Sequence, residues 1–161
     1  IQVYGESKLA GERNVRRNYS QALIVRTSFL YGLRGDNNKL SGFPAWLLSN
    51  INDGEPVALF SDQWITPTDT TFAAKSILNL IETGISGLVH LAGSACMTPF
   101  EFGEIVADTA GHDTEKLRKV TMDEAEREAP RPSYTCLETS KLRRLTEVSP
   151  QGPRETLQFF N

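Results

Sequence analysis

The sequence lacks the features that mark membrane, nucleic-acid-binding and disulfide-rich proteins. Its 161 residues carry a formal net charge of −3, which gives no basic surface for nucleic acid. No apolar run approaches the roughly 20 residues that a membrane-spanning helix needs, and no secretory signal opens the chain. Size and composition are those of one ordinary globular domain with a sizeable core. We therefore expect a cytoplasmic protein.

Cysteine is scarce as well. Cys96 and Cys136 stand singly in unrelated sequence contexts. Two such residues make neither a disulfide framework nor a zinc site, and cytosolic thiols are kept reduced. We expect two free thiols at or near the surface.

Several binding and catalytic motifs are also missing. Gly32 and Gly35 stand three apart, which is not the G-x-G opening of a dinucleotide-binding turn, so we interpret this stretch as a loop. The histidines have no metal-binding spacing, and His90 lies in an apolar run that suits a hydrogen-bonded core histidine. No G-x-S-x-G motif supports serine-based hydrolysis. The sequence indicates no metal site.

The first dozen residues carry a pattern that suits carbonyl chemistry. Tyr4 and Lys8 stand four apart in a proline-free stretch typical of a helix, so both lie on one helix face. An ammonium beside a phenol favours the phenolate, and a phenol tuned in this way can exchange a proton with a carbonyl or alcohol. The hydride for carbonyl reduction must come from a cofactor, because no side chain carries one. The bare spacing also fits a surface pair whose lysine stem covers the ring.

Apolar runs and helical stripes alternate along the rest of the chain. The expected elements are a buried strand (22–31), a loop (32–40), a helix (43–51), a strand (57–60), a loop (61–69), a helix capped by Thr68 or Asp69, a strand (87–93), a helix opened by Ser94 or Thr98 and ended by Gly111, a strand (117–120) and short helices (139–145, 153–160). This order predicts an α/β fold with a parallel sheet.

Arg131 is a candidate ligand contact. Pro130 and Pro132 hold its backbone stiff, and a guanidinium suits a phosphate. From the residues alone, a solvated loop arginine is the alternative.

Five segments, taken in order, resemble the extended short-chain dehydrogenases/reductases. They are YGESKLAGE, ALIVRTSFLYG, SDQWITPTDTTFAA, GLVHLAG and RPSYTCLETSKL. Within that superfamily the chain is most similar to the dTDP-4-dehydrorhamnose reductase group. The resemblance covers nearly the whole chain but only the C-terminal part of such an enzyme. The group's glycine-rich dinucleotide turn would precede Ile1.

The resemblance implies a reaction and roles for individual residues. Tyr4 would protonate the C4 carbonyl of a nucleotide-linked 4-keto-6-deoxy sugar, with NADP or NAD in reduced form as the hydride donor. Lys8 would bind the nicotinamide ribose, and Tyr4, Lys8, Thr27 and Ser28 would line the cofactor site. Phe29 and Arg131 would contact the substrate, although Phe29 stands where these reductases often have Trp.

The implied fold is the C-terminal part of a Rossmann-like doubly wound parallel sheet with a small, mostly helical substrate-binding subdomain. We expect residues 1–93 to carry the sheet and the Tyr-Lys helix, with a substrate-side insertion near 33–62. Residues 94–161 would form the subdomain. The implied partners are a nucleotide-sugar substrate and a homodimer as the assembly to test, with no nucleic acid and no membrane. This chain alone is expected to be inactive.

Two interpretations of other classes stay open. A sugar-nucleotide epimerase or dehydratase would use the same Tyr and Lys for a different half-reaction. A non-catalytic regulatory subunit, like that of methionine adenosyltransferase, would keep the fold and bind a partner enzyme. Intact Tyr4 and Lys8 favour an enzyme, but a fold does not fix a function.

Overall fold

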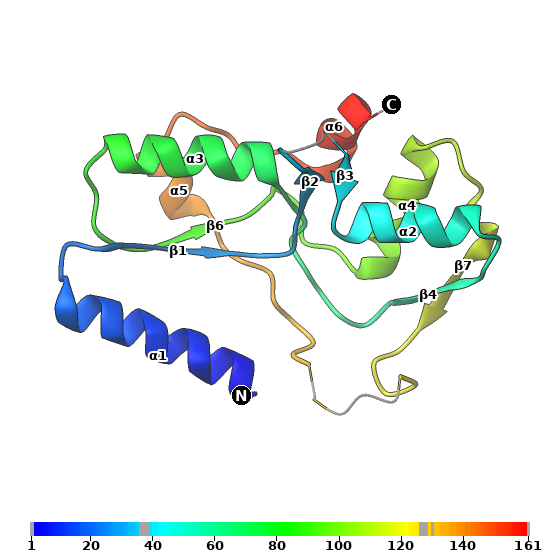
Figure 1. The fold of residues 1–161 in the computed structure, drawn as a ribbon, viewed down its shortest axis with the longest axis horizontal. Coiled ribbons are helices and arrows are strands. Elements are labelled where there is room, and N and C mark those ends of the chain that lie inside the picture. Colours follow the sequence, from blue (N-terminus) through cyan, green and yellow to red (C-terminus); the bar gives the residue numbers. More distant parts are fainter. Residues whose placement is uncertain (1, 36–38, 126–128, 130, 161) are drawn as a thin grey trace.

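Two pairs of parallel strands, each with helices against it, organise the computed structural model (Figure 1), which describes residues 2–35, 39–125, 129 and 131–160. The elements in chain order are α1 (Val3–Asn18), β1 (Leu23–Thr27), β2 (Leu30–Leu33), β3 (Leu40–Ser41), α2 (Phe43–Asn52), β4 (Val57–Phe60), β5 (Thr68–Asp69), α3 (Thr70–Glu82), β6 (Gly87–Leu91), α4 (Pro99–Thr109), a 3-10 turn (Thr114–Lys116), β7 (Leu117–Val120), α5 (Ser140–Leu145), α6 (Pro153–Thr156) and a second 3-10 turn (Leu157–Phe160).

Strand pairing is mostly parallel. β1 pairs with β6 in parallel, from Leu23 opposite Gly87 to Thr27 opposite Leu91. β4 pairs with β7 in parallel, and β2 lies between parallel β5 and antiparallel β3. Long crossovers that contain helices separate the parallel partners, as parallel pairing requires. The predicted α/β fold with parallel strands is confirmed.

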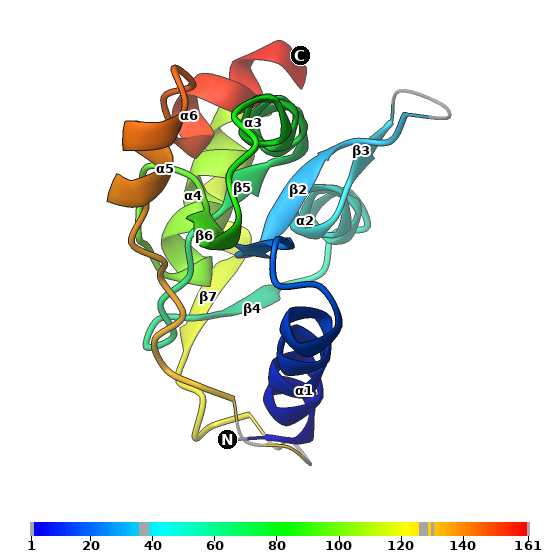
Figure 2. The same cartoon turned by 90° about the vertical axis from the view of Figure 1, so that its left-hand side faces the viewer.

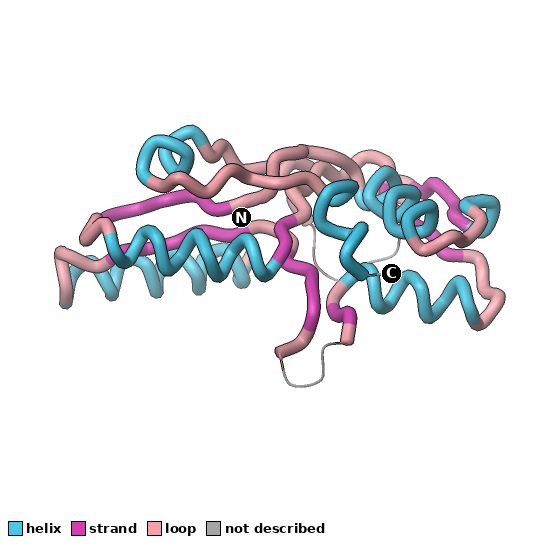
Figure 3. The backbone as a smooth tube through the Cα atoms, turned by 90° about the horizontal axis from the view of Figure 1, so that it is seen from above, coloured by secondary structure: helices cyan, strands magenta, loops and turns pink. Residues whose placement is uncertain are grey.

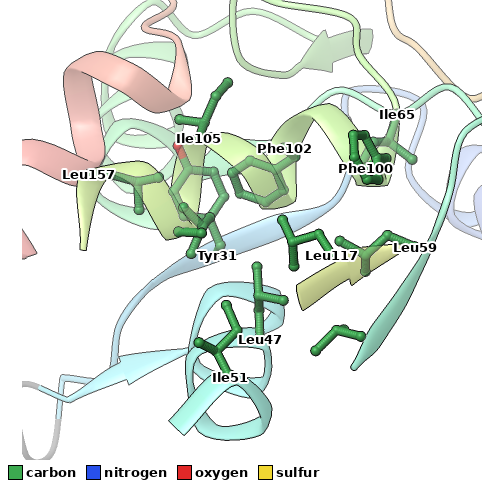
Figure 4. Close-up of a cluster of buried hydrophobic side chains, with 13 residues drawn as sticks. Tyr31, Leu47, Ile51, Leu59, Ile65, Phe100, Phe102, Ile105, Leu117 and Leu157 are labelled. Atoms are coloured by element: carbon green, nitrogen blue, oxygen red, sulfur yellow. The ribbon is translucent and has the colours of Figure 1, made fainter. Parts of the chain in front are cut away.

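Apolar side chains gather in two cores. The larger core joins α2, β4, α4 and β7, and the smaller joins α3, β6 and α5. Figure 3 shows helices lying beside strands at both ends of the molecule. In the larger core, Phe102 lies against Tyr31, with ring centroids 5.0 Å apart (Figure 4). Burial raises the pKa of Tyr31 to about 12, and its hydroxyl hydrogen-bonds Thr156 at 2.5 Å, so Tyr31 is structural.

Helix α1 stands outside both cores. None of its described side chains is buried, and Figures 1 and 2 show α1 and α3 on opposite sides of the β1–β6 pair. The chain turns back after α1, so α1 runs antiparallel to β1 (Figure 1). The first turn of α1, which carries Tyr4, therefore lies towards the carboxyl end of β1.

Helix ends follow the signals in the sequence. Asp69 caps α3 by accepting a 2.8 Å hydrogen bond from the Phe72 N–H. Thr98 and Glu101 form a reciprocal capping box at the start of α4. Gly111 has φ +73° just after α4, the left-handed conformation that commonly ends helices. Of the two alternatives at each start, the structure selects Asp69 and Thr98.

Two predictions for residues 22–40 are wrong in detail. The single strand predicted at 22–31 is two strands, because Phe29 takes φ +41° and turns the chain between β1 and β2. The predicted loop at 32–40 gives its first two residues to β2 and its last to β3. Residues 36–38 of that loop lie outside the described part. Such short strands leave too few residues for an alternation signal.

The expectation of two free thiols is wrong, because Cys96 and Cys136 form a disulfide with Cα atoms 5.7 Å apart. The pairing has a local cause. Met97 bridges Ile65, and Tyr134 bridges Trp64, so each cysteine lies close in the chain to a residue paired with the same stretch of backbone. The bond joins the loop before α4 to the segment that follows Arg131.

Reduction of this disulfide is expected to lower the free energy of unfolding by about 2–4 kcal/mol, because the bond closes a long loop in the unfolded chain. Thermal unfolding with and without dithiothreitol measures the loss. The double variant Cys96→Ser/Cys136→Ser is the control. It should melt at the same temperature with and without dithiothreitol, and that temperature should be lower than that of the oxidised protein. Identical melting of the oxidised and reduced protein would contradict the expectation.

Candidate functional site

Tyr4 and Lys8 meet on neighbouring turns of α1, as their spacing predicts. The Lys8 Nζ atom lies 5.3 Å from the centroid of the Tyr4 ring, a cation–π distance. The Tyr4 side chain is 66% exposed, and Lys8 is exposed too. A lysine that only covers a ring makes the same contact, so the surroundings decide the interpretation.

One turn beyond Lys8, Glu12 forms a bidentate ion pair with Arg26 of β1. Arg26 Nε donates to Glu12 Oε1 at 2.7 Å, and Arg26 Nη2 donates to Oε2 at 2.8 Å. This hydrogen bonding lowers the pKa of Glu12 against the opposing effect of desolvation, and it raises the pKa of Arg26. The Arg16 guanidinium and the His90 ring add smaller electrostatic effects that also lower the pKa of Glu12. The pair joins α1 to β1 immediately before Thr27.

The carboxyl end of β1 presents Thr27, Ser28 and Phe29. Thr27 is exposed, and Ser28 is half-buried with its Oγ accepting a 3.4 Å hydrogen bond from the Thr66 N–H. Phe29 has φ +41°, a conformation that costs a non-glycine residue on the order of 1 kcal/mol and is often found at functional sites. Its carbonyl accepts a 3.0 Å hydrogen bond from Thr68, and its ring packs edge-on against Phe43. The strand end is therefore held firmly.

The loop after β4 is tied to the segment that carries Arg131. The Asp62 carboxylate accepts two hydrogen bonds from the Met122 N–H, at 2.9 and 3.1 Å. The Gln63 amide donates to the Pro132 carbonyl at 3.4 Å. These bonds fix the loop rather than offer polar groups to a ligand.

The end of the same loop packs against the end of β6. Thr68 Oγ1 accepts a 3.2 Å hydrogen bond from the Gly93 N–H and donates to the Thr66 carbonyl at 3.0 Å. A Cβ atom at Gly93 would collide with the Pro67 carbonyl, so glycine is needed for this close approach. The carboxyl ends of β1 and β6 thus share one rigid support.

Arg131 is exposed and begins a segment that is anchored soon afterwards. Tyr134 forms a parallel bridge with Trp64, whose N–H donates to the Ser133 carbonyl at 2.7 Å. The disulfide holds the segment two residues after the bridge. Pro130, the other half of the predicted stiff loop, lies outside the described residues.

The arrangement brings most of the predicted residues to one end of the β1–β6 pair. Figures 1 and 2 both show the described part of the β7–α5 connection passing close to the N-terminal end of α1. In open α/β sheets, ligands bind outside the carboxyl ends of the strands, which is where these parts meet. Within the described chain, no hydrogen bond or ion pair joins Arg131 to Tyr4 or Lys8.

The described residues hold neither a metal-binding cluster nor a membrane-spanning helix. No three side chains of His, Cys, Asp or Glu are grouped there to hold a metal ion. No helix of that part is long and apolar enough to cross a membrane. His90 is half-buried, with its Nδ1 atom 3.2 Å from the Glu138 carbonyl, so the predicted hydrogen bond is present, but the side chain belongs to neither apolar core.

Sequence reasoning missed the Glu12–Arg26 pair and the bridge between Trp64 and Tyr134. Glu12 follows Lys8 at the step by which Lys8 follows Tyr4, so helical spacing carried one turn further identifies it. Arg26 directly follows an apolar strand run, where a buried partner is expected for its charge. The bridge joins residues far apart in the chain and leaves no local signal.

Residues 1–160 match the family described as RmlD substrate binding domain. The chain belongs to this family. It is 42% identical over 142 residues to a probable low-salt glycan biosynthesis reductase of Haloferax volcanii, covering 88% of this chain and 47% of that protein. It is 30% identical over 159 residues to a dTDP-4-dehydrorhamnose reductase of Mycolicibacterium smegmatis, covering 98% and 47%.

Solved structures agree with the family. The dTDP-4-dehydrorhamnose reductase from Bacillus anthracis, in complex with NADP, has a TM-score of 0.88 and 28% identity, covering 99% of this chain and 55% of that one. The predicted resemblance and Rossmann-like fold class are confirmed. This RmlD substrate-binding-domain chain spans about half the length of the curated relatives it matches.

In this member of the family, Glu12 is expected to titrate below the ordinary carboxyl pKa of 4.5, because Arg26 stabilises its charged form. The pair therefore stabilises the folded chain above that pH, and the stabilisation is lost as pH falls through the lowered pKa. An NMR titration of the Glu12 carboxyl carbon measures the shift. In Arg26→Gln the titration should move back up, and an unchanged curve would contradict the assignment.

Proposed function

We propose that the protein containing this chain reduces the C4 carbonyl of a nucleotide-linked 4-keto-6-deoxy sugar, with hydride from NADPH or NADH and a proton from Tyr4. The observation that carries the proposal is the contact of Lys8 with Tyr4 on the turn of α1 that faces the carboxyl end of β1. Relatives named dTDP-4-dehydrorhamnose reductase, one of them solved with NADP, support the substrate class and the cofactor. Because the chain spans half of such proteins, the proposal concerns the whole protein.

Reduction of a ketone needs a hydride on carbon and a proton on oxygen. NAD(P)H supplies the hydride when bound. The exposed Tyr4 hydroxyl can donate a proton to a carbonyl oxygen held at the strand end. As the proton leaves, negative charge develops on the phenol, and the Lys8 ammonium beside the ring stabilises it.

The groups around the strand end suit the nicotinamide side of a dinucleotide. Lys8 has three N–H donors, which can hydrogen-bond ribose hydroxyls. Thr27 exposes a hydroxyl, and Ser28 keeps its O–H as a donor because its Oγ acts as acceptor towards Thr66. We assign the cofactor contacts of this chain to Tyr4, Lys8, Thr27 and Ser28.

Phe29 and Arg131 are the proposed substrate contacts. The Phe29 ring is half-buried and fixed by its aromatic neighbours, so it offers an apolar surface beside the reacting carbon. Arg131 carries an exposed guanidinium on an anchored segment, and this group can bind a diphosphate in a bidentate manner. These two positions would hold the sugar and the phosphates of one substrate.

The proposal extends to the organisation of the chain. Residues 1–93 would carry the sheet and residues 94–161 the substrate-binding subdomain. Packing of α2 and β4 against α4 and β7 supports placing the 33–62 insertion on the substrate side. We also propose a cytoplasmic homodimer. Since disulfides are uncommon in the cytosol, alkylation of free thiols in intact cells before lysis tests its location through the state of Cys96 and Cys136.

The amount of NADPH consumed for each sugar turned over distinguishes the remaining alternatives. A reductase consumes one NADPH for each sugar turned over. An epimerase or dehydratase that returns the hydride within one cycle consumes none. A non-catalytic subunit shows no turnover with any nucleotide sugar.

Tyr4→Phe is expected to lower kcat for NADPH-dependent reduction of a dTDP-4-keto-6-deoxy sugar by about 10²–10⁴-fold, because the proton donor is lost. Steady-state NADPH oxidation by the whole protein measures the effect. Tyr19→Phe is the matched control, since Tyr19 follows the same helix and is similarly exposed at 64%. Undiminished turnover in Tyr4→Phe would remove Tyr4 from the mechanism.

Arg131→Gln is expected to raise KM for the nucleotide sugar by about 10–100-fold with little change in kcat, since a charge-assisted contact to phosphate is worth roughly 1.5–3 kcal/mol. Initial rates across a substrate series give both constants. Arg118→Gln changes another exposed arginine, on β7, and should leave KM unaltered. If both variants behave alike, Arg131 does not hold the substrate.

A further inference from the structure

We propose that Glu12 and Arg26 are positioning residues, which set the height and rotation of α1 so that Tyr4 and Lys8 face the end of β1. The inference rests on the proposed function, because it assigns the pair a role in the reaction of Tyr4. Neither residue would touch the substrate or cofactor. The pair would act through the geometry of the helix.

Helix α1 has little else to hold it in place. None of its described side chains enters either apolar core. Its N-cap residue, Gln2, makes no side-chain capping bond. Within the described part of α1, the side-chain hydrogen bonds of Ser7 and Asn18 stay inside the helix, and those between Glu12 and Arg26 reach another element. The polar pair therefore has the role that apolar packing has in the other long helices.

The positions of the two residues show what the pair fixes. Tyr4 precedes Glu12 by roughly two helical turns, which is about 12 Å along the axis. A strand rises by about 3.3 Å per residue, so this distance is longer than the stretch from Arg26 to Phe29, where the chain turns out of β1. Because α1 runs antiparallel to β1 (Figure 1), the pair sets Tyr4 just past the strand end, near the turn that Phe29 makes.

The geometry of the pair restricts rotation as well as distance. Two nitrogens of the Arg26 guanidinium bind the two oxygens of Glu12 in a fork-to-fork contact, which fixes the relative orientation of the groups. The Glu12 side chain is 16% exposed and that of Arg26 42%, so the contact is partly shielded from solvent. Tyr4, Lys8 and Glu12 follow one another at steps of four, so the orientation of Glu12 sets the direction in which Tyr4 points.

The structure contains a second arginine–carboxylate pair that serves as a control. Arg154 and Asp108 make a single 3.2 Å contact, and both side chains are 67% exposed. That pair joins α6 to α4, away from the residues of the candidate site. Removing it tests the effect of losing an arginine–carboxylate pair without moving α1.

The test measures steady-state kinetics of the whole protein for Glu12→Gln, Arg26→Gln, the double variant and Arg26→Lys. Glu12→Gln keeps the size of the side chain and removes its charge. The single variants should lose roughly 10–100-fold in kcat while KM for the nucleotide sugar stays within about twofold, since a shift of about 1 Å in a reacting group has effects of this size. The double variant should be no worse than the poorer single variant, because the two residues act as one unit.

Conservative replacement and amide exchange separate positioning from general stability. Arg26→Lys keeps the charge and one contact, so it should recover part of the kcat lost in Arg26→Gln. A charge reversal is a poor rescue, because an arginine at position 12 would face Arg16 and His90. Amide hydrogen exchange should rise in the first turns of α1 in Glu12→Gln, with the two apolar cores unchanged. Asp108→Asn should alter neither kcat nor exchange in α1.

The outcomes also separate this inference from the proposed function. Normal kcat in both single variants, while Tyr4→Phe is inactive, would overturn the positioning role and leave the reductase proposal standing. Loss of stability without the split between kcat and KM would overturn it too. Full activity of Tyr4→Phe would instead remove the proposed function. Exchange in α1 does not depend on the choice of substrate, and unchanged exchange in Glu12→Gln would also overturn the inference.

Discussion

The two-point contact between Glu12 and Arg26 is the constraint on which the geometry of the candidate site depends. The other elements that border the site belong to an apolar core or to a backbone ladder. Helix α1 has neither kind of support within the described chain, yet it carries both residues assigned to proton transfer. An ion pair is directional, so one contact can define height and rotation together, which an apolar stripe defines less sharply. Protonation of Glu12 makes the contact sensitive to acid, and the partial exposure of Arg26 makes it sensitive to salt.

Hydrogen bonds that involve the backbone hold the other parts of the candidate site in place. The Thr68 N–H donates to the carbonyl of the strained Phe29, and Thr68 Oγ1 accepts from the Gly93 N–H, so Phe29 and the residues after β6 are held against the same loop. That loop continues through Gln63 and Trp64 into contacts with the segment that follows Arg131. The Cys96–Cys136 disulfide also joins this segment to the loop before α4. A substrate bound here would therefore meet a fixed platform, with α1 as the part whose position depends on charge.

Sequence reasoning predicts those parts of the fold that depend on local patterns. The helical stripe ending before Gly84, the caps at Asp69 and Thr98 and the apolar run of β6 each follow from neighbouring residues, and the structure agrees. The Tyr4–Lys8 contact is local as well. The left-handed Phe29, the two-residue strand β5 and the pairing of Cys96 with Cys136 depend on residues far away in the chain. No spacing within one segment encodes them, because each is stabilised by tertiary contacts.

The side chains of this chain suit the reacting groups of the proposed reaction but not the pyrophosphate of a dinucleotide. The residues of this chain supply a phenol, an ammonium and hydroxyls near one strand end, and these groups suit the reacting ends of a sugar and a nicotinamide. They contain no glycine-rich turn to receive a pyrophosphate. About half the length of the matched relatives lies outside the similarity. Binding of a dinucleotide and placement of Tyr4 are then separate requirements, and the proposed role of Glu12 and Arg26 concerns the placement alone.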